Sequence, residues 1–163
     1  MLVNNIHLPK LMGIVNGTPD SFYNKSRIDQ FSINSTNFQY ADIVDIGFES
    51  SRPGAVPLAE KDEISRLEHF LAHYPHFHHT LSIDTYKPQV ASIALKNGFK
   101  IINDIMGGGI NGEMLEIALM FNSPIVIMHM KEKPATMQNS PYYDNIVDEL
   151  LSYFENRIKF ALD

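Results

Sequence analysis

The stretch TLSIDTYKPQVASIALKNGFKIINDI, residues 80–105, contains two strand-like runs with a helix-like run between them. The outer runs, Thr80–Asp84 and Lys100–Ile105, are rich in Ile and Leu and lack regular polar alternation, a pattern typical of strands buried on both faces. The middle run, Lys87–Asn97, has apolar residues at helical spacing, a proline in its first turn and a glycine just after its end. We therefore expect a strand–helix–strand unit with parallel strands.

The same alternation extends in both directions along the chain. Further strands are expected at Leu11–Asn16, Asp42–Gly47 and Ser123–Met130, and further helices at Leu58–Tyr74, Met114–Asn122 and Tyr142–Leu162. Residues 26–40 are expected to be irregular, because Asn, Ser and Thr dominate there and no helical stripe emerges. Parallel strands separated by amphipathic helices indicate an α/β fold, either a barrel or a doubly wound sheet.

The composition excludes several classes of function. A length of 163 residues with 44% hydrophobic residues is ordinary for one globular domain, and a formal charge of −6 offers no basic surface to nucleic acid. No apolar run reaches the roughly 18 to 20 residues that a membrane helix needs, and the N-terminus lacks the pattern of a signal peptide. Because the chain has no cysteine, disulfides and thiolate chemistry are excluded. Together with the lack of a membrane helix and of a signal peptide, this leads us to expect a cytoplasmic protein with no membrane partner.

Carboxylate and amide side chains recur toward the ends of the expected strands. Asn16, Asp45, Asp84 and the pair Asn103-Asp104 occupy these positions in four different runs. The C-terminal ends of parallel strands converge on the ligand site of α/β folds, so these side chains are expected to face a common ligand. The alternative is that each one caps the helix that follows, as Asp and Asn often do. Recurrence at four strands favours the ligand site.

Two polar loops follow the first two strands on the same side of the expected sheet. Thr18–Phe22 begins one loop, and Glu49–Gly54 begins the other. Arg52 offers a planar fork of donors that suits an anionic oxygen group, and the hydroxyls of Thr18 and Ser51 can add neutral hydrogen bonds. Because Pro-Asp and Pro-Gly pairs mark turns in any protein, turn formation alone is the alternative.

These strands and loops resemble those of dihydropteroate synthases, the pterin-binding barrel enzymes of folate synthesis. MGIVNGTPDSF, residues 12–22, resembles the first signature of that family, and ADIVDIGFESSRPG, residues 41–54, resembles the second. SIDTYKP (82–88), IINDI (101–105) and IMHM (127–130) continue the resemblance in the family's order. The resemblance therefore covers nearly the whole chain.

The resemblance implies a (β/α)₈ TIM-type barrel, of which residues 1–163 form one partial domain with about the first five β/α units. It implies a transferase that condenses 6-hydroxymethyl-7,8-dihydropterin pyrophosphate with p-aminobenzoate, giving dihydropteroate and pyrophosphate. The family's remaining strands carry another aspartate, a lysine and an arginine–histidine pair, so we expect this chain to be inactive alone. A continuation of the chain or a second polypeptide would supply those strands, and family members are often homodimers.

The family's site residues are carried over to the matching positions of this sequence. By resemblance, Asn16 holds pyrophosphate and its Mg²⁺, and Arg52 contacts anionic oxygens nearby. Asp84 and Asn103 are implied to read the donor and acceptor edge of the pterin, and Met128 to pack near its ring.

Residues of the two loops are implied to complete the site. Thr18 and Ser51 are expected to bind substrate, and Ser51 stands where the family usually has threonine. The loops that contain Asp20, Phe22 and Pro53 resemble those that close over the p-aminobenzoate subsite and exclude water. The family chemistry is dissociative, so negative groups are expected to stabilise positive charge near the exocyclic carbon. The expected catalytic residues are Asp45, Arg52 and Asp20.

Two positions depart from the family pattern. Gly17 replaces the usual aliphatic residue of the first signature, and Phe48 replaces a glycine of the second. A glycine at a strand end often permits a close backbone approach, so we expect the Phe48 ring to crowd the pterin cleft or to shift Glu49.

Other interpretations stay open beside the synthase. One alternative is a degenerate remnant that binds pterin without catalysis. The other is a folate-dependent methyltransferase with a similar barrel, although the loop signatures favour the synthase. Five histidines lie between residues 69 and 79, and the helical spacing of His69 and His73 suits a metal site. We expect this cluster to be solvated surface instead, because it lies opposite the active-site face of a barrel.

Overall fold

The computed structural model describes residues 9–17, 39–50, 56–73, 78–109, 111–130 and 142–162. Five strands form one sheet in the order β1-β2-β3-β4-β5. The strands are β1 (Met12–Asn16), β2 (Ile43–Gly47), β3 (Thr80–Asp84), β4 (Ile101–Asp104) and β5 (Ile125–Ile127). The described helices are α2 (Glu60–His73), α3 (Pro88–Lys96), α4 (Glu113–Met120) and α5 (Ile146–Leu162).

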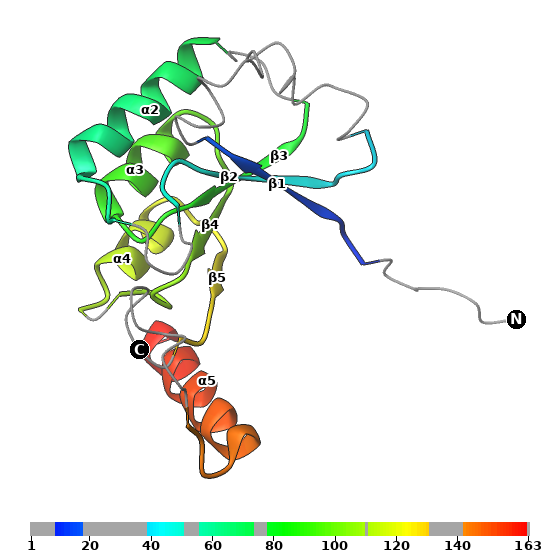
Figure 1. Cartoon of the computed structure of the whole chain (residues 1–163), viewed down its shortest axis with the longest axis vertical. Coiled ribbons are helices and arrows are strands. Elements are labelled where there is room, and N and C mark those ends of the chain that lie inside the picture. The colour runs from blue at the N-terminus through cyan, green and yellow to red at the C-terminus, as the bar shows by residue number, and fades with distance from the viewer. Residues whose placement is uncertain are drawn as a thin grey trace, which may run out of the picture.

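The strand order distinguishes the two fold classes that the sequence leaves open. A doubly wound sheet reverses its strand order at a switch point, whereas a barrel adds each new strand beside the previous one. Every strand here pairs in parallel with the next strand of the sequence. Helices α2, α3 and α4 cover one face of the sheet (Figure 1), as right-handed crossovers require. The arrangement is that of five neighbouring strands of a (β/α)₈ barrel.

The hydrophobic core lies between the sheet and these three helices. Val44, Ile46, Ile83 and Ile102 point from the strands toward the helices and are fully buried. The helices pack against them with apolar residues spaced three or four positions apart, for example Leu67 and Phe70 of α2. Burial of this kind stabilises the fold by about 25 cal/mol per Å² of apolar surface removed from water.

The other face of the sheet is polar near the C-terminal ends of its central strands. Successive strand residues point to opposite faces, and the register pairs Asp45 with Ser82 and Asp84 with Asn103. These four residues therefore share the face opposite the helices, which is the interior of a barrel. This face will be called the inner face.

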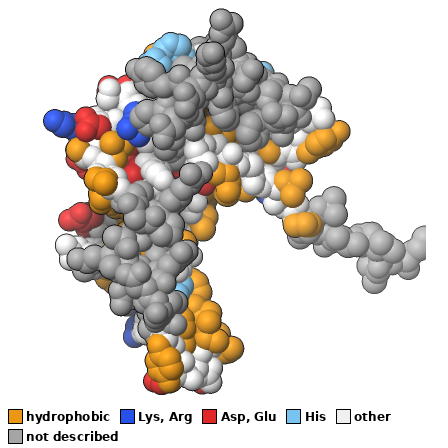
Figure 2. Space-filling model, viewed as in Figure 1, with side chains coloured by type: hydrophobic (Ala, Val, Ile, Leu, Met, Phe, Trp, Pro, Cys, Tyr) orange, Lys and Arg blue, Asp and Glu red, His pale blue; other side chains and the backbone are white. Residues whose placement is uncertain are grey.

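Apolar side chains are exposed at both edges of the sheet and along α5. Ile14 of β1 is 68% exposed, and Val126 of β5 is exposed as well. Helix α5 contains no buried residue, and Figure 2 shows hydrophobic side chains along it at the bottom of the view. Its exposed apolar residues are Ile146, Val147, Leu151, Ile158, Phe160 and Leu162.

The expected elements are confirmed, and most are shorter than expected; β3 has the expected bounds, and α4 begins one residue earlier, at Glu113. Helix α5 begins at Ile146 rather than at Tyr142, because the Asn145 side chain accepts a 3.1 Å hydrogen bond from the backbone N–H of Val147 and caps the helix there. Of the segment expected to be irregular, only residues 39 and 40 are described, and they form a turn. No helix in the described part of the chain is long and apolar enough to cross a membrane.

Candidate ligand-binding site

Three of the polar residues expected at strand ends lie in one row across the sheet. The register pairs Asn16 with Gly47, Gly47 with Asp84, and Asp84 with Asn103. Because the strands are parallel, this row lies at the C-terminal ends of four neighbouring strands, where barrel enzymes place their active sites. Four separate runs of the sequence thus contribute to one surface.

Asp45 lies one layer deeper on the same face, two residues before the end of β2. It is only 3% exposed, and its Oδ2 accepts a hydrogen bond of 2.9 Å from Nδ2 of Asn103. The other carboxylate oxygen and the hydroxyl of the neighbouring Ser82 are buried and have no hydrogen-bond partner among the described residues. Buried polar atoms are normally paired, so these two groups have unused capacity toward the barrel interior.

Asp84 is held in an environment that disfavours its charge. Burial raises the pKa of this carboxyl from 3.8 to about 7, and the negative charges of Asp45, Glu63, Asp104 and Glu49 add to the effect. A ligand that donates hydrogen bonds to this carboxyl favours its ionised form. The ionisation of Asp84 should therefore depend on whether a ligand donates hydrogen bonds to it.

A second polar cluster lies beside Asp84, at the turn between β3 and α3. The Lys87 ammonium donates hydrogen bonds to the carboxylates of Glu49 and Glu63, and the Tyr86 hydroxyl donates to the other oxygen of Glu49 at 2.9 Å. Burial alone would lower the pKa of Lys87, but the bonds to the two carboxylates outweigh it and the pKa is raised. Lys87 is therefore a stably charged cation next to an acidic site.

The structure corrects the expectation that Phe48 crowds the site. Its ring is fully buried on the helix side of the sheet, edge-to-face with Phe70 of α2 at a centroid distance of 5.7 Å. Strand alternation explains this, because residues 44, 46 and 48 share the helix side. The ring also fills the space beside Gly17, where an added Cβ would lie 2.6 Å from Cδ1 of Phe48. The two departures from the family pattern therefore compensate each other, and the Phe48 ring does not occupy the inner face.

The structure also corrects the expectation that Asp104 faces the ligand. This residue is fully buried, and its carboxylate accepts hydrogen bonds of 2.8 Å from the backbone N–H groups of Met106 and Gly108. Arg157 of α5 holds the same turn, since its Nε donates to the carbonyl oxygen of Gly107 at 2.8 Å. Asp104 therefore shapes the turn after β4, because alternation from Asn103 places it on the helix side.

Met128 and the loop residues contribute less to the described site. Met128 follows β5, and its backbone carbonyl accepts a hydrogen bond of 2.9 Å from the Tyr153 hydroxyl. Its contact with a pterin ring stays a prediction. The other expected site residues lie outside the described part of the chain: Thr18, Asp20, Phe22, Ser51, Arg52 and Pro53.

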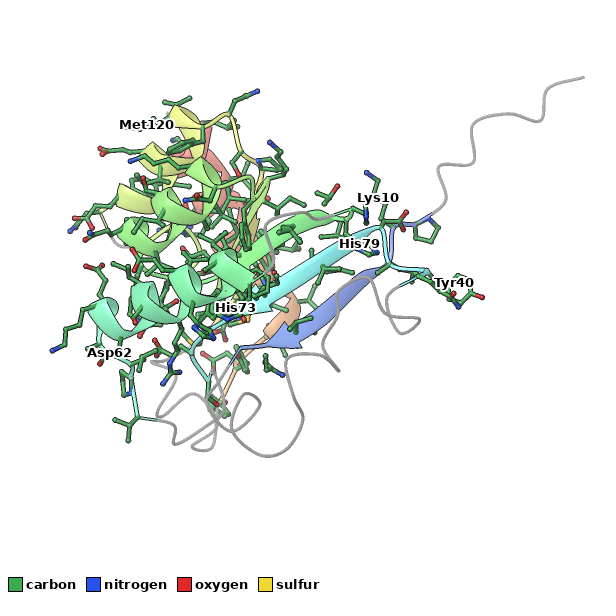
Figure 3. All side chains as sticks on the ribbon, turned by 90° about the horizontal axis from the view of Figure 1, so that it is seen from above. Lys10, Tyr40, Asp62, His73, His79 and Met120 are labelled. Atoms are coloured by element: carbon green, nitrogen blue, oxygen red, sulfur yellow. The ribbon has the colours of Figure 1, made fainter. Side chains whose placement is uncertain are left out.

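The described residues contain no ready-made metal cage. Within them, no group of three or more His, Cys, Asp or Glu side chains could hold a metal ion. In the histidine cluster, His73 Nδ1 lies 2.7 Å from the backbone carbonyl oxygen of His69. His79 lies with Lys10 and Tyr40 at the end of the sheet where the strands begin (Figure 3), away from the site. Asn16 presents an exposed amide at the opposite end.

Sequence reasoning did not assign roles to Ser82, Lys87 or Glu63. The position of Ser82 could have been found by counting two residues back from Asp84 along the strand. Glu63 gives a weaker signal, because it is a carboxylate within the buried stripe of α2 that includes Leu67. Such a residue requires a buried partner, but Lys87 lies 24 positions away and no local pattern connects the two.

Comparisons with known proteins point to one family. The chain matches the family described as pterin binding enzyme over residues 12–162. It is 36% identical to the dihydropteroate synthase of Haemophilus influenzae, over 97% of this chain and 59% of that protein.

Solved structures give the same result. A Yersinia pestis dihydropteroate synthase in a sulfonamide drug complex matches with a TM-score of 0.82 and 35% identity, over 94% of this chain and 58% of that one. The Burkholderia cenocepacia dihydropteroate synthase complexed with 7,8-dihydropteroate matches with a TM-score of 0.76 and 34% identity, over 97% and 55% of the respective chains. The chain thus spans a little over half the length of these relatives.

Proposed function

Because the chain belongs to the pterin-binding enzyme family, we propose that it forms the pterin-binding portion of a dihydropteroate synthase. The observation that carries the proposal is the 2.9 Å hydrogen bond between Asp45 and Asn103, beside Asp84 on the inner face. This bond fixes the Asn103 amide in one orientation, so its remaining groups face the ligand in a defined pattern. A flat heterocycle with fixed donors and acceptors suits such a pattern.

The proposed ligand of the inner face is 6-hydroxymethyl-7,8-dihydropterin pyrophosphate. Asn103 uses one N–H to hold Asp45, which leaves its oxygen and its second N–H for the pterin edge. Asp84, once ionised, accepts two neighbouring N–H groups of the pterin. Because the pKa of Asp84 is raised to about 7, pterin binding at mildly acidic pH releases a proton. Met128 packs against the ring.

In the proposed reaction, the amine of p-aminobenzoate forms a bond to the exocyclic carbon of the pterin, whose bond to oxygen breaks as pyrophosphate leaves. The amine nitrogen then releases one proton to water. Positive charge develops on the pterin, and the acidic groups around Asp84 stabilise it. Asp45 contributes its charge and the orientation of Asn103. The loop residues keep the roles that the family resemblance implies: Thr18, Asp20, Phe22, Ser51, Arg52 and Pro53.

Asn16 is proposed to bind Mg²⁺ together with the pyrophosphate of the substrate. This cation takes oxygen ligands, keeps several waters and binds largely through substrate phosphates rather than in a protein cage. An exposed amide at the end of β1, with no acidic cage among the described residues, fits that mode of binding. The bound ion would neutralise charge on the leaving pyrophosphate.

The remaining strands of the barrel are proposed to come from a further part of the chain or from a second polypeptide. In the described sheet β1 and β5 are edge strands, and Met12, Ile14 and Val126 are exposed there. A closed barrel pairs its edges and buries such residues. The next β/α unit would also cover the exposed apolar side of α5.

The test of pterin binding uses the full chain and 6-hydroxymethylpterin, followed by the fluorescence of the pterin. The wild-type chain should bind saturably, and Asp84→Asn should weaken binding by about 10- to 100-fold, since a hydrogen bond to a charged group contributes about 1.5–3 kcal/mol. Asp62→Asn, an exposed carboxylate on α2, is the matched control and should bind like the wild type. Equal binding by the wild type and Asp84→Asn, or no saturable binding, would overturn the proposal.

Catalysis is tested with both substrates and Mg²⁺. The 163-residue chain alone should form no dihydropteroate, and adding a polypeptide that carries the remaining β/α units should produce it. Turnover by the 163-residue chain alone would contradict the need for further strands.

A further inference from the structure

The backbone pairing of β2 and β3 ends with Gly47 and Asp84. Beyond that point, side-chain hydrogen bonds connect the segments that follow the two strands. Glu49 lies two residues past Gly47, and Tyr86 and Lys87 follow shortly after Asp84. The Tyr86 hydroxyl donates to Oε1 of Glu49 at 2.9 Å, and the Lys87 ammonium donates to Oε2. Both oxygens of one carboxylate are thus held by the turn that immediately follows Asp84.

The same ammonium also reaches α2. It donates to Oε2 of Glu63, which is 1% exposed. Lys87 therefore joins three parts of the chain: the segment after β2, helix α2, and the turn after β3. A second bond fastens α2 at this place, because Nη1 of Arg66 donates to the backbone carbonyl of Phe48 at 2.7 Å.

Burial makes this arrangement sensitive to the loss of the cation. Charges with little access to water attract each other strongly, and removing one partner leaves the others buried and uncompensated. The pKa of Lys87 is raised despite its burial, so the ammonium stays charged at every pH near neutrality. The arrangement is therefore present under the conditions in which the site would work.

We propose that Lys87 is a positioning residue of the pterin site, which keeps Asp84 in its buried place by tying the turn after β3 to Glu49 and Glu63. The inference rests on the proposed function, since Asp84 is the group that would read the pterin. Lys87 acts through Asp84, because the hydrogen bonds of its ammonium within the described residues go to the two glutamates.

The decisive substitutions are Lys87→Met, which removes the charge at similar length, and Lys87→Arg, which keeps it. Lys96→Met, at the exposed end of α3, is the matched control. Carboxyl ¹³C NMR follows the ionisation of Asp84 in each full-length variant. In Lys87→Met the carboxyl should reach water, so its pKa should fall from about 7 toward the ordinary 3.8. In the other two variants it should stay near 7.

An unchanged or raised pKa of Asp84 in Lys87→Met would overturn the proposal, because losing a neighbouring cation in an intact site does not lower the pKa of a carboxyl. Lys87→Met with Glu63→Gln is the second variant, should the single variant fail to fold. It removes one charge of each sign and leaves no buried anion on α2. Because the charge of Glu63 itself raises the pKa of Asp84, Glu63→Gln alone is the reference for this variant. The pKa of Asp84 should fall further in the double variant than in Glu63→Gln, and equal values in the two would again overturn the proposal.

Binding of 6-hydroxymethylpterin to the same proteins distinguishes this proposal from the proposed function. Lys87→Met should weaken binding by at least about 10-fold, as the loss of a supporting partner commonly does, and Lys87→Arg should restore most of the affinity. A wild-type chain that binds no pterin would defeat the proposed function, while the NMR titration would still decide whether Lys87 positions Asp84.

Discussion

At the scale of single residues, the placement of the Asp84 carboxyl links stability to pH. Burial, with the charges of Asp45 and three other carboxylates, raises its pKa from 3.8 to about 7. A carboxyl whose pKa is higher in the folded state contributes stability that is fully present below pH 3.8 and is lost as the pH rises through about 7. We therefore predict that the wild type loses stability relative to Asp84→Asn across this window.

Urea unfolding of both proteins at a series of pH values measures this difference. Asp62→Asn is the reference, because it makes the same chemical change at an exposed position on α2. The difference in unfolding free energy between the wild type and Asp84→Asn should change with pH, and that for Asp62→Asn should change much less. A pH-independent difference at Asp84 would contradict the prediction.

Gly17 and Phe48 are in contact, so substitutions at the two positions should have non-additive effects on stability. Gly17→Val should destabilise the protein by about 1–3 kcal/mol, because even its Cβ would lie 2.6 Å from the Phe48 ring. Phe48→Ala should cost about 3–5 kcal/mol by leaving a cavity. In the double variant the valine fills part of that cavity, so the cost should be lower than the sum by at least about 1 kcal/mol. Denaturant unfolding of the four proteins closes the cycle, and additive costs would show that the pair is not coupled.

At the scale of elements, α5 depends on few contacts with the rest of the described chain. Arg157 donates to the carbonyl oxygens of Gly107 at 2.8 Å and Gly109 at 2.6 Å, and no residue of the helix is buried. We predict that Arg157→Lys loosens α5 by about 1–3 kcal/mol, because lysine lacks the planar fork that reaches both carbonyls. Hydrogen exchange should rise in residues 146–162 and not in β2 or β3.

Lys159→Met is the control for α5, since this lysine lies on the exposed side of the same helix. Its exchange rates should match those of the wild type. If Arg157→Lys left the exchange of α5 unchanged, packing rather than these hydrogen bonds would hold the helix.

Most elements could be predicted from the sequence because their signals are local. Helical spacing, Pro88 at the start of α3 and Gly98 after its end act within a few residues, and the structure follows them closely. The exact ends could not be predicted, because they depend on single side chains such as the Asn145 cap of α5. The choice of a barrel also needed the strand order, which is a long-range property.

The candidate site could be predicted only in part, because only some of its residues lie in local sequence patterns. Asp84 and Asn103 lie in local strand-end patterns, and the register brings them side by side. The support behind them depends on contacts between distant segments, such as Lys87 with Glu63, which a sequence pattern does not reveal. Phe48 is a clear example, because the space for its ring depends on Gly17, which lies 31 positions earlier in the sequence.

At the scale of the whole molecule, the described chain presents two surfaces of different character. The helix side of the sheet is covered and well packed, whereas the inner face and α5 expose apolar residues such as Ile14 and Leu151. Exposed edges of parallel strands and large apolar patches favour association. The chain spans just over half the length of its relatives, so the surfaces that it exposes are those that further barrel strands would cover.

This exposure leads to the last prediction, that the 163-residue chain self-associates in solution and binds a hydrophobic dye such as ANS. Ile14→Lys combined with Leu151→Lys should reduce both properties, because these residues lie on the edge of β1 and on α5. The unfolding free energy should change by no more than about 0.5 kcal/mol, since both side chains are largely exposed. Val56→Lys, which replaces an exposed apolar residue that belongs to neither β1 nor α5, should leave association and dye binding unchanged. Sedimentation velocity at several concentrations measures association, and a wild-type chain that stays monomeric and binds no dye would show that these surfaces are not adhesive.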